Sequence, residues 1–141
     1  MEFDVLLAED SRSYRALLER EIARHPRLRL VRATYDGWDA ATLVCRLQPD
    51  IAVVDLHMPG HDGLDVARAV RAARPAPRTT LVLLTSALSP VVERRAHRAG
   101  FGCCLSKASP PAEIAAALVR VAERARERRF MRARDPVRLR R

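Results

Sequence analysis

The sequence predicts an α/β fold of the doubly wound type, in which a five-stranded parallel sheet lies between two layers of helices. Two observations carry this prediction. Short apolar segments alternate five times with longer helix-like segments along the 141 residues, and the central short segments contain continuous apolar runs (VLLA, IAVV and LVLL) instead of apolar residues at every second position. Continuous apolar strands are typical of parallel sheets that are covered on both faces. The length suits a single domain.

The first two β-α units are marked by short apolar runs and by helix punctuation. We expect strands at residues 3–8 and 28–35, because both segments are short and largely apolar. Apolar residues at helical spacing predict a helix over residues 11–25, which Pro26 ends. The same reasoning predicts a helix over residues 38–47.

The remaining three units follow the same pattern. The predicted strands lie at residues 51–56, 80–85 and 103–106, and the predicted helices at residues 64–74, 90–99 and 109 to about 128. Ser89 is a typical N-cap, Pro90 suits the first helical position, and Gly100 ends the helix between them. In sheets of this kind the functional crevice lies at the carboxyl ends of the strands.

Composition excludes several classes of protein. Apolar residues make up 48% of the chain, enough for a folded core. No apolar run approaches the roughly 20 residues of a bilayer span, and the amino-terminal segment carries acids where a signal peptide would carry basic residues. Cys45, Cys103 and Cys104 are odd in number and lack metal-ligand spacing, which argues against a disulfide framework or a zinc site. We therefore expect a cytoplasmic protein with no membrane partner.

The net charge of +9 is concentrated near the carboxyl end of the sequence. Residues 120–141 contain ten arginines and three acids, a balance of +7, and the first 119 residues carry only +2. Two interpretations stay open: a solvated helix end that leads into a linker, or an arm that contacts phosphate groups.

Polar side chains collect where the predicted strands end. They are Glu9 and Asp10 after the first strand, Asp55 at the end of the third, Thr85 at the end of the fourth and Lys107 after the fifth. Because these strand ends share one edge of the sheet, we expect the side chains to lie together. Lys107 is also the single lysine among 26 basic residues. Its compact ammonium suits a small anion site that a planar guanidinium does not fit.

The five residues together predict a phosphoryl-transfer site. Three neighbouring carboxylates repel one another unless a cation neutralises them or their pKa values rise. Hard oxygen ligands of this kind suit Mg²⁺, which keeps positions for water and phosphate. Beside such an ion Asp55 is the expected nucleophile and would form an acyl phosphate. Lys107 and Thr85 would stabilise the phosphoryl oxygens.

Four segments resemble the receiver domains of two-component response regulators. They are VLLAEDS (5–11), PDIAVVDLHMPGHDGLD (49–65), LVLLTSA (81–87) and CLSKAS (104–109). The likeness covers residues 1 to about 128. It implies a flavodoxin-like receiver fold with strand order 2-1-3-4-5 and a sensor histidine kinase as the phosphoryl donor. It also implies that the chain is not an enzyme, beyond slow loss of its own phosphoryl group.

The resemblance assigns a role to each site residue. It makes Glu9 and Asp10 the acidic pair that binds Mg²⁺ with Asp55 and the backbone carbonyl of His57, Asp55 the phosphoacceptor, Thr85 the switch hydroxyl, and Lys107 the contact to the phosphoryl group. The His57 imidazole is not expected to bind metal, because no second His or Cys lies at a suitable spacing. Tyr35 and Trp38 are expected to be packing residues.

Cys104 departs from the pattern of the family. Three residues before the lysine, receivers usually carry a Tyr or Phe that swings inward on activation, and a thiol is too small to fill that pocket. The coupling between this position and Thr85 is therefore open. One alternative is an atypical receiver that acts without phosphorylation as a dimerisation or scaffold module. Another is a redox sensor built on Cys103 and Cys104.

The expected division of the chain is a receiver domain at residues 1–128, followed by a basic tail or the start of a linker at residues 129–141. The stretch KASPPAEIAAALVRVA (107–122) is similar to the NarL/FixJ-type group, whose receivers carry a DNA-binding domain. Transcriptional output would need such a domain, which this sequence does not contain: either the sequence is a receiver cut from a longer regulator, or it acts alone. The arginine-rich tail would otherwise bind DNA only weakly. A protein–protein output is the alternative, and we expect a homodimer on activation.

Overall fold

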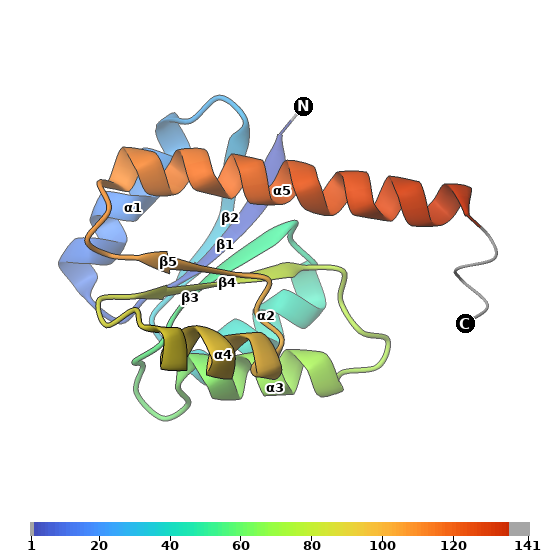
Figure 1. The fold of residues 1–141 in the computed structure, drawn as a ribbon. Coiled ribbons are helices and arrows are strands. Elements are labelled where there is room, and N and C mark those ends of the chain that lie inside the picture. The colour runs from blue at the N-terminus through green and yellow to red at the C-terminus, as the bar shows by residue number, and fades with distance from the viewer. Residues whose placement is uncertain (1, 136–141) are drawn as a thin grey trace.

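The computed structural model describes residues 2–135 and shows a single five-stranded parallel sheet. The strands are β1 (Phe3–Ala8), β2 (Leu28–Thr34), β3 (Ile51–Asp55), β4 (Thr80–Thr85) and β5 (Cys103–Ser106). The helices are α1 (Arg12–Arg24), α2 (Gly37–Leu47), α3 (Gly63–Ala72), α4 (Pro90–Ala99) and α5 (Pro111–Arg134). The strand order is β2-β1-β3-β4-β5, so the predicted doubly wound topology is confirmed (Figure 1).

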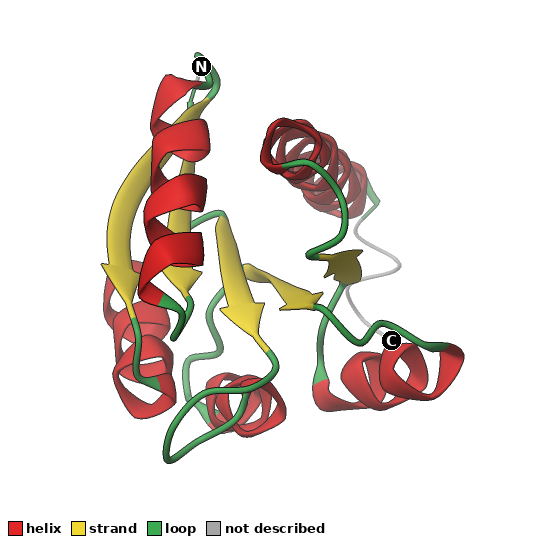
Figure 2. Ribbon diagram, turned by 90° about the vertical axis from the view of Figure 1, so that its left-hand side faces the viewer, coloured by secondary structure: helices red, strands yellow, loops and turns green. Residues whose placement is uncertain are grey.

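Two helical layers cover the two faces of the sheet (Figure 2). One core cluster packs α2, α3 and α4 against one face, and the other packs α1 and α5 against the opposite face. Strand side chains alternate between the faces, so Leu83 joins the first cluster and its neighbours Val82 and Leu84 join the second. Burial on both faces explains why the central strands contain continuous apolar runs. No helix among residues 2–135 is both long enough and apolar enough to cross a bilayer.

Capping residues set the limits of the helices that follow the functional strands. Asp62 accepts a hydrogen bond from the backbone N–H of Asp65, and the Asp65 carboxylate accepts one from the Asp62 N–H, which forms a capping box at the start of α3. Ser89 caps α4 in the predicted way, with Pro90 as the first helical residue. Gly100 ends α4 with a φ of +117°, in the left-handed region that favours glycine.

Strand register brings the carboxyl ends of four strands to one level. Ala8 of β1 pairs with Val54 of β3, so Glu9 follows β1 where Asp55 ends β3. Thr85 of β4 pairs with Ser106 of β5, so Lys107 follows directly beyond Thr85. The hydrogen-bond ladder therefore holds the predicted site residues at one edge of the sheet.

The last helix is longer than the sequence predicted. α5 continues to Arg134, six residues past the expected end near Arg128. The residues beyond 128 are mostly good helix formers. No proline occurs between residues 112 and 135, and Pro136 disfavours helical backbone in the residue before it. A dense run of arginines suggests a tail by its charge, but arginine has a high helix propensity.

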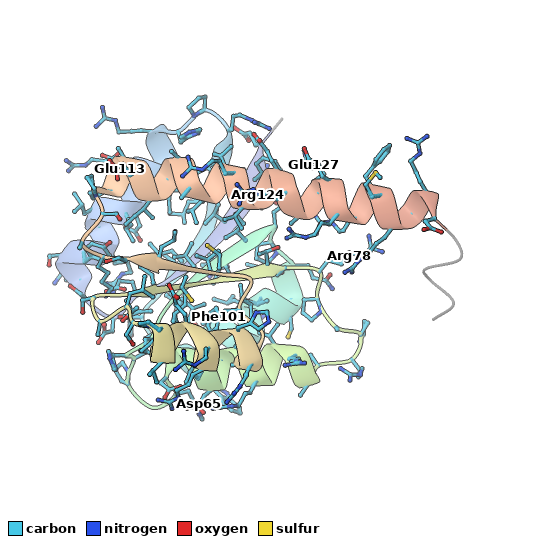
Figure 3. All side chains as sticks on the ribbon, in the orientation of Figure 1. Asp65, Arg78, Phe101, Glu113, Arg124 and Glu127 are labelled. Carbon is cyan, nitrogen blue, oxygen red and sulfur yellow. The ribbon has the colours of Figure 1, made fainter. Side chains whose placement is uncertain are left out.

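A contact near the start of this extension joins it to the sheet side of the molecule. Arg129 donates a hydrogen bond from Nη1 to the backbone carbonyl of Arg78, at 3.1 Å. Arg78 lies beneath the C-terminal half of α5 (Figure 3). The expected boundary between residues 128 and 129 thus falls inside a helix, and the rest of the predicted tail, residues 136–141, lies outside the described residues.

Tyr35 and Trp38, expected to be packing residues, lie mostly at the surface. Both side chains are 64% exposed. The Trp38 ring contacts the His61 ring, with centroids 4.8 Å apart, and the Arg15 guanidinium lies over the Tyr35 ring at 5.6 Å. Tyr35 lies in the β2–α2 connection, and Trp38 lies in the first turn of α2. Both positions are at the surface, where the spacing of residues along a helix does not decide their burial.

Candidate functional site

Three carboxylates meet at the carboxyl edge of the sheet. Glu9, Asp10 and Asp55 each place a carboxylate oxygen within 4.8 Å of the other two. Glu9 is fully buried and Asp55 is 3% exposed, while Asp10 is exposed. The group is therefore open to solvent on the Asp10 side and enclosed by protein on the other.

Lys107 is the cation that the structure places among these acids. Its Nζ donates a hydrogen bond to Glu9 Oε1 at 2.7 Å and lies 3.2 Å from Asp55 Oδ2. The same Nζ lies 5.0 Å from the centre of the Tyr14 ring, within the range of a cation–π interaction. The single lysine of the chain thus reaches the position that the sequence argument required.

The surroundings of Asp55 favour its protonated form. Burial raises the pKa of the Asp55 carboxyl most, and a hydrogen bond to Asp10 and the negative charge of Glu9 raise it further. Lys107 lowers the pKa, but the net result is a pKa of about 7, against an ordinary value of 3.8. The metal-free site therefore holds more negative charge than Lys107 neutralises.

The pKa of Lys107 moves in the direction that preserves its charge. Burial alone lowers the pKa of the ammonium, but its hydrogen bond to Glu9 and the attraction of Asp55 more than offset this effect. The net pKa is raised, so Lys107 stays protonated across the physiological range.

Thr85 ends β4 with a fully buried side chain. Its Oγ1 accepts a hydrogen bond from the Ala87 N–H at 3.1 Å, and its backbone carbonyl accepts one from the Lys107 N–H at 2.9 Å. This contact uses a lone pair of the hydroxyl oxygen and not its hydrogen, so the O–H group can still donate a hydrogen bond. The residue thus ties the β4–α4 connection to the loop that carries Lys107.

The donor set fits a hard divalent cation. Within residues 2–135, the buried Glu9 Oε2 has no hydrogen-bond partner, and a buried carboxylate oxygen without a donor is costly. Three carboxylates with a solvent-facing side match the oxygen ligands and retained waters of Mg²⁺. The residues present therefore suit the metal that the sequence predicted.

His57 follows Asp55, the predicted phosphoacceptor, by two residues. Its backbone N–H donates to Asp55 Oδ1 at 3.3 Å, which helps to orient that carboxylate. Its side chain is exposed. The role of its backbone carbonyl as a metal ligand stays a prediction.

Three further residues shape the site and were not identified from the sequence. Tyr14 packs beside Lys107, and Arg15 donates from Nη1 to the Glu9 carbonyl at 2.8 Å. A Cβ on Gly63 would lie 2.6 Å from the Asp55 carbonyl oxygen, so the start of α3 needs glycine there. Tyr14 and Arg15 follow Asp10 by about one helical turn, and this spacing was the one available signal.

Cys104, at the position expected to act as the switch, carries a protonated thiol. Burial raises the pKa of Cys104 to about 11, with smaller contributions from Cys103 and Glu93. Cys104 packs against the cluster that contains Phe101, labelled in Figure 3, whereas Cys103 packs against the cluster on the opposite face. The two thiols therefore point to opposite faces of the sheet. Burial also raises the pKa of the Cys103 thiol, so both thiols stay protonated, and this disfavours a redox role because the thiolate is the reactive form.

Comparison with known proteins agrees with this geometry. The family model described as the response regulator receiver domain matches residues 5–119. A solved structure of the signal receiver domain of NarL from Mycobacterium tuberculosis is similar, with a TM-score of 0.80 and 30% identity over 86% of this chain and 97% of that one. The response regulator domain of Thermotoga maritima CheB has the same fold, with a TM-score of 0.76 at 23% identity over 89% and 96% of the two chains.

Curated relatives include protein-glutamate methylesterase/protein-glutamine glutaminases. The one from Anaeromyxobacter dehalogenans is 34% identical over 110 residues, which cover 78% of this chain and 31% of that protein. The one from Myxococcus xanthus is 40% identical over 78 residues, 55% of this chain and 22% of that protein. The chain thus spans less than a third of these two relatives. They do not support the DNA-binding output expected for the NarL/FixJ-type group, and the matches do not single out that group. From the match over residues 5–119, we conclude that the chain belongs to the response regulator receiver domain family.

Proposed function

We propose that the chain is a phosphoacceptor receiver, in which Asp55 accepts a phosphoryl group from a sensor histidine kinase and Mg²⁺ binds at Glu9, Asp10 and Asp55. One observation carries the proposal. The three carboxylates lie within 4.8 Å of one another, and the single lysine lies 3.2 Å from the Asp55 carboxylate. A cluster with this charge balance suits a divalent cation and a phosphoryl anion together.

The chemistry assigned to Asp55 is nucleophilic attack on phosphorus. A carboxylate oxygen of Asp55 forms the new O–P bond while the bond from phosphorus to the donor breaks, and the donor keeps the electron pair. Bound Mg²⁺ would neutralise charge on the phosphoryl oxygens. Lys107 holds a positive charge 3.2 Å from Asp55. The Thr85 hydroxyl is available to donate a hydrogen bond to the product.

The acyl phosphate supplies the signal by its charge. A phosphoryl group adds about −1.5 to −2 charge at neutral pH, close to Thr85 and Lys107. Both residues begin connections to helices, Thr85 to α4 and Lys107 to α5. New bonds from these residues to the phosphoryl group would move both connections and so change the surface that a partner meets.

A second candidate function rests on Cys104. This position carries a small thiol where receivers usually carry an aromatic ring that swings inward, so phosphorylation has a smaller side chain to move. The alternative is a scaffold or dimerisation module whose surface does not depend on phosphate. Sizing chromatography before and after phosphorylation separates the two: a shift to a homodimer supports the switch, and one unchanged elution volume supports the scaffold.

The output proposed here passes through protein contacts. The described helices and strands are those of one receiver. The predicted domain is residues 1–128, and the predicted tail is residues 129–141. Some relatives are methylesterases in which the matched part is under a third of the protein. We assign the switched surface to a partner domain or a second copy of the chain, in the cytoplasm where histidine kinases act.

Phosphorylation of the full chain by acetyl phosphate tests the proposal. With Mg²⁺ present, intact-mass measurement should show one added phosphoryl group on the wild type and none on Asp55→Asn. Asp62→Asn is a matched control, because it removes an acid from the same loop outside the cluster, and it should be labelled like the wild type. Equal labelling of Asp55→Asn, or labelling that does not need Mg²⁺, would contradict the proposal.

A further inference from the structure

A groove between α3 and α4 gathers four arginines away from the carboxylate cluster. Its lining consists of Arg68, Arg71, Ala72, Arg95, Arg98 and Ala99, and its volume is about 480 Å³. No acid lines it. We propose that this groove binds a small polyphosphate anion, with two or three linked phosphoryl groups.

The arginines are arranged as two facing pairs. Arg68 and Arg71 lie three residues apart on α3, and Arg95 and Arg98 lie three residues apart on α4. Residues at this spacing share one face of a helix and lie about 4.5 Å apart along its axis. The side chains of each pair therefore line the groove from opposite walls over a single helical turn.

Both walls of the groove rest on the folded core. Val70 of α3 and Ala96 and Ala99 of α4 are buried in the same core cluster. Arg71 also donates from Nη1 to the backbone carbonyl of Arg98 at 2.8 Å, which fixes the C-terminal end of α4 against α3. A ligand would meet two helical walls whose backbone is already in place, which reduces the entropy cost of binding.

Most of the positive charge in the groove is not neutralised. Arg68 pairs with Asp65 at 3.2 Å, but both side chains are exposed, and such pairs are weak. Within residues 2–135, neither Arg95 nor Arg98 has an ion-pair partner for its guanidinium. Four like charges over one helical turn repel one another, and a multivalent anion would relieve that repulsion.

Several features favour a compact phosphate ligand. Guanidinium groups bind phosphate oxygens in pairs, which matches arginine better than lysine to this chemistry. Two alanine side chains supply the apolar lining, so recognition depends on charge. The volume lies within the range of small-molecule sites. Asp65 and Glu93 lie in the first turns of α3 and α4, so the positive surface ends on the side that faces the carboxylate cluster. An extended nucleic-acid backbone would need the positive surface to continue on that side.

Titration of the full chain with inorganic tripolyphosphate tests this site. Calorimetry at fixed ionic strength, without Mg²⁺ or a phosphoryl donor, keeps the result independent of phosphorylation at Asp55. The double variant Arg68→Gln/Arg95→Gln removes one guanidinium from each wall. The control Arg128→Gln/Arg132→Gln removes the same charge from a second arginine-lined cleft, of about 500 Å³, beside α5.

We expect saturable binding to the wild type, at least tenfold weaker binding to the groove variant, and less than a twofold change in the control. Arg68→Lys/Arg95→Lys keeps the charge and should recover only part of the affinity, because lysine cannot bind an oxygen pair in the same way. Equal losses in the groove variant and the control would overturn the proposal, as would absence of saturable binding. It would also be overturned if a 20-base-pair duplex DNA lost affinity with the groove variant while tripolyphosphate binding did not change.

Discussion

At the level of single residues, the site depends on how Glu9 and Asp55 are held together. Glu9 is fully buried and Asp55 nearly so, and Lys107 contacts both. A buried ion pair adds little to stability by itself, because desolvation offsets the attraction. One ammonium facing three acids leaves an excess of negative charge. The arrangement is therefore better suited to binding a cation than to stabilising the fold.

This excess charge predicts that Asp55→Asn stabilises the metal-free protein at high pH. The folded-state pKa of Asp55, about 7, lies above its ordinary value of 3.8, so the folded state binds the proton more tightly than the unfolded state. Wild-type stability should then fall as pH rises from about 4 to about 7. Urea unfolding without Mg²⁺ should show the variant more stable than the wild type at pH 8 and nearly equal to it at pH 4. A variant that is less stable than the wild type at pH 8 would contradict this reading of the charge balance.

The account also predicts that Lys107→Arg impairs the switch although the charge is kept. The ammonium reaches Glu9 and Asp55 from one compact nitrogen, and a planar guanidinium is too large for that position. The variant should fold, but phosphorylation should produce a smaller change in hydrogen exchange over residues 86–89. An exchange response equal to that of the wild type would show that charge alone is sufficient.

At the level of elements, the sequence identified every strand and helix, and among the helices it placed α4 best, at both ends. Ser89, Pro90 and Gly100 act locally, so their effect can be read without the fold. The end of α5 and the exposure of Tyr35 and Trp38 could not be read in this way. Helix length depends on where a breaker lies, and burial of an aromatic residue depends on what the chain packs over it.

The β3–α3 connection predicts a steric effect at Gly63. A Cβ there would lie 2.6 Å from the Asp55 carbonyl oxygen and 3.1 Å from the Leu56 Cα, and both atoms belong to the backbone. Gly63→Ala should therefore cost about 1–3 kcal/mol in unfolding free energy and slow phosphorylation by moving Asp55. Chemical denaturation and the labelling rate measure the two effects. A cost below about 0.5 kcal/mol, typical of surface sites, would show that the loop adjusts freely.

The extension of α5 predicts a small effect of truncation. Phe130 and Met131 are 60% and 63% exposed, so the helix beyond Arg128 buries little apolar surface. A chain that ends at residue 128 should lose less than about 1 kcal/mol of stability and keep its labelling by acetyl phosphate. Loss of cooperative unfolding in this truncated chain would show that the extension belongs to the core structure.

At the level of the whole molecule, residues 1–119 are nearly neutral overall, and positive charge gathers on the C-terminal half of α5 and in the groove between α3 and α4. The sequence located the carboxylate cluster because parallel strands bring their carboxyl ends together, which is a rule of topology. It did not reveal the arginine groove, because the facing pairs come from two helices that only the fold places side by side. Residues that act through strand order were predictable, and those that act through helix packing were not.

The most direct test of the central claim is to locate the phosphoryl group on the chain. After reaction with acetyl phosphate and Mg²⁺, peptide mapping by mass spectrometry should place it on the peptide that contains Asp55. Asp10→Asn should slow the reaction and raise the Mg²⁺ concentration that it needs. A phosphoryl group on any other peptide, or a Mg²⁺ dependence unchanged by Asp10→Asn, would contradict the account.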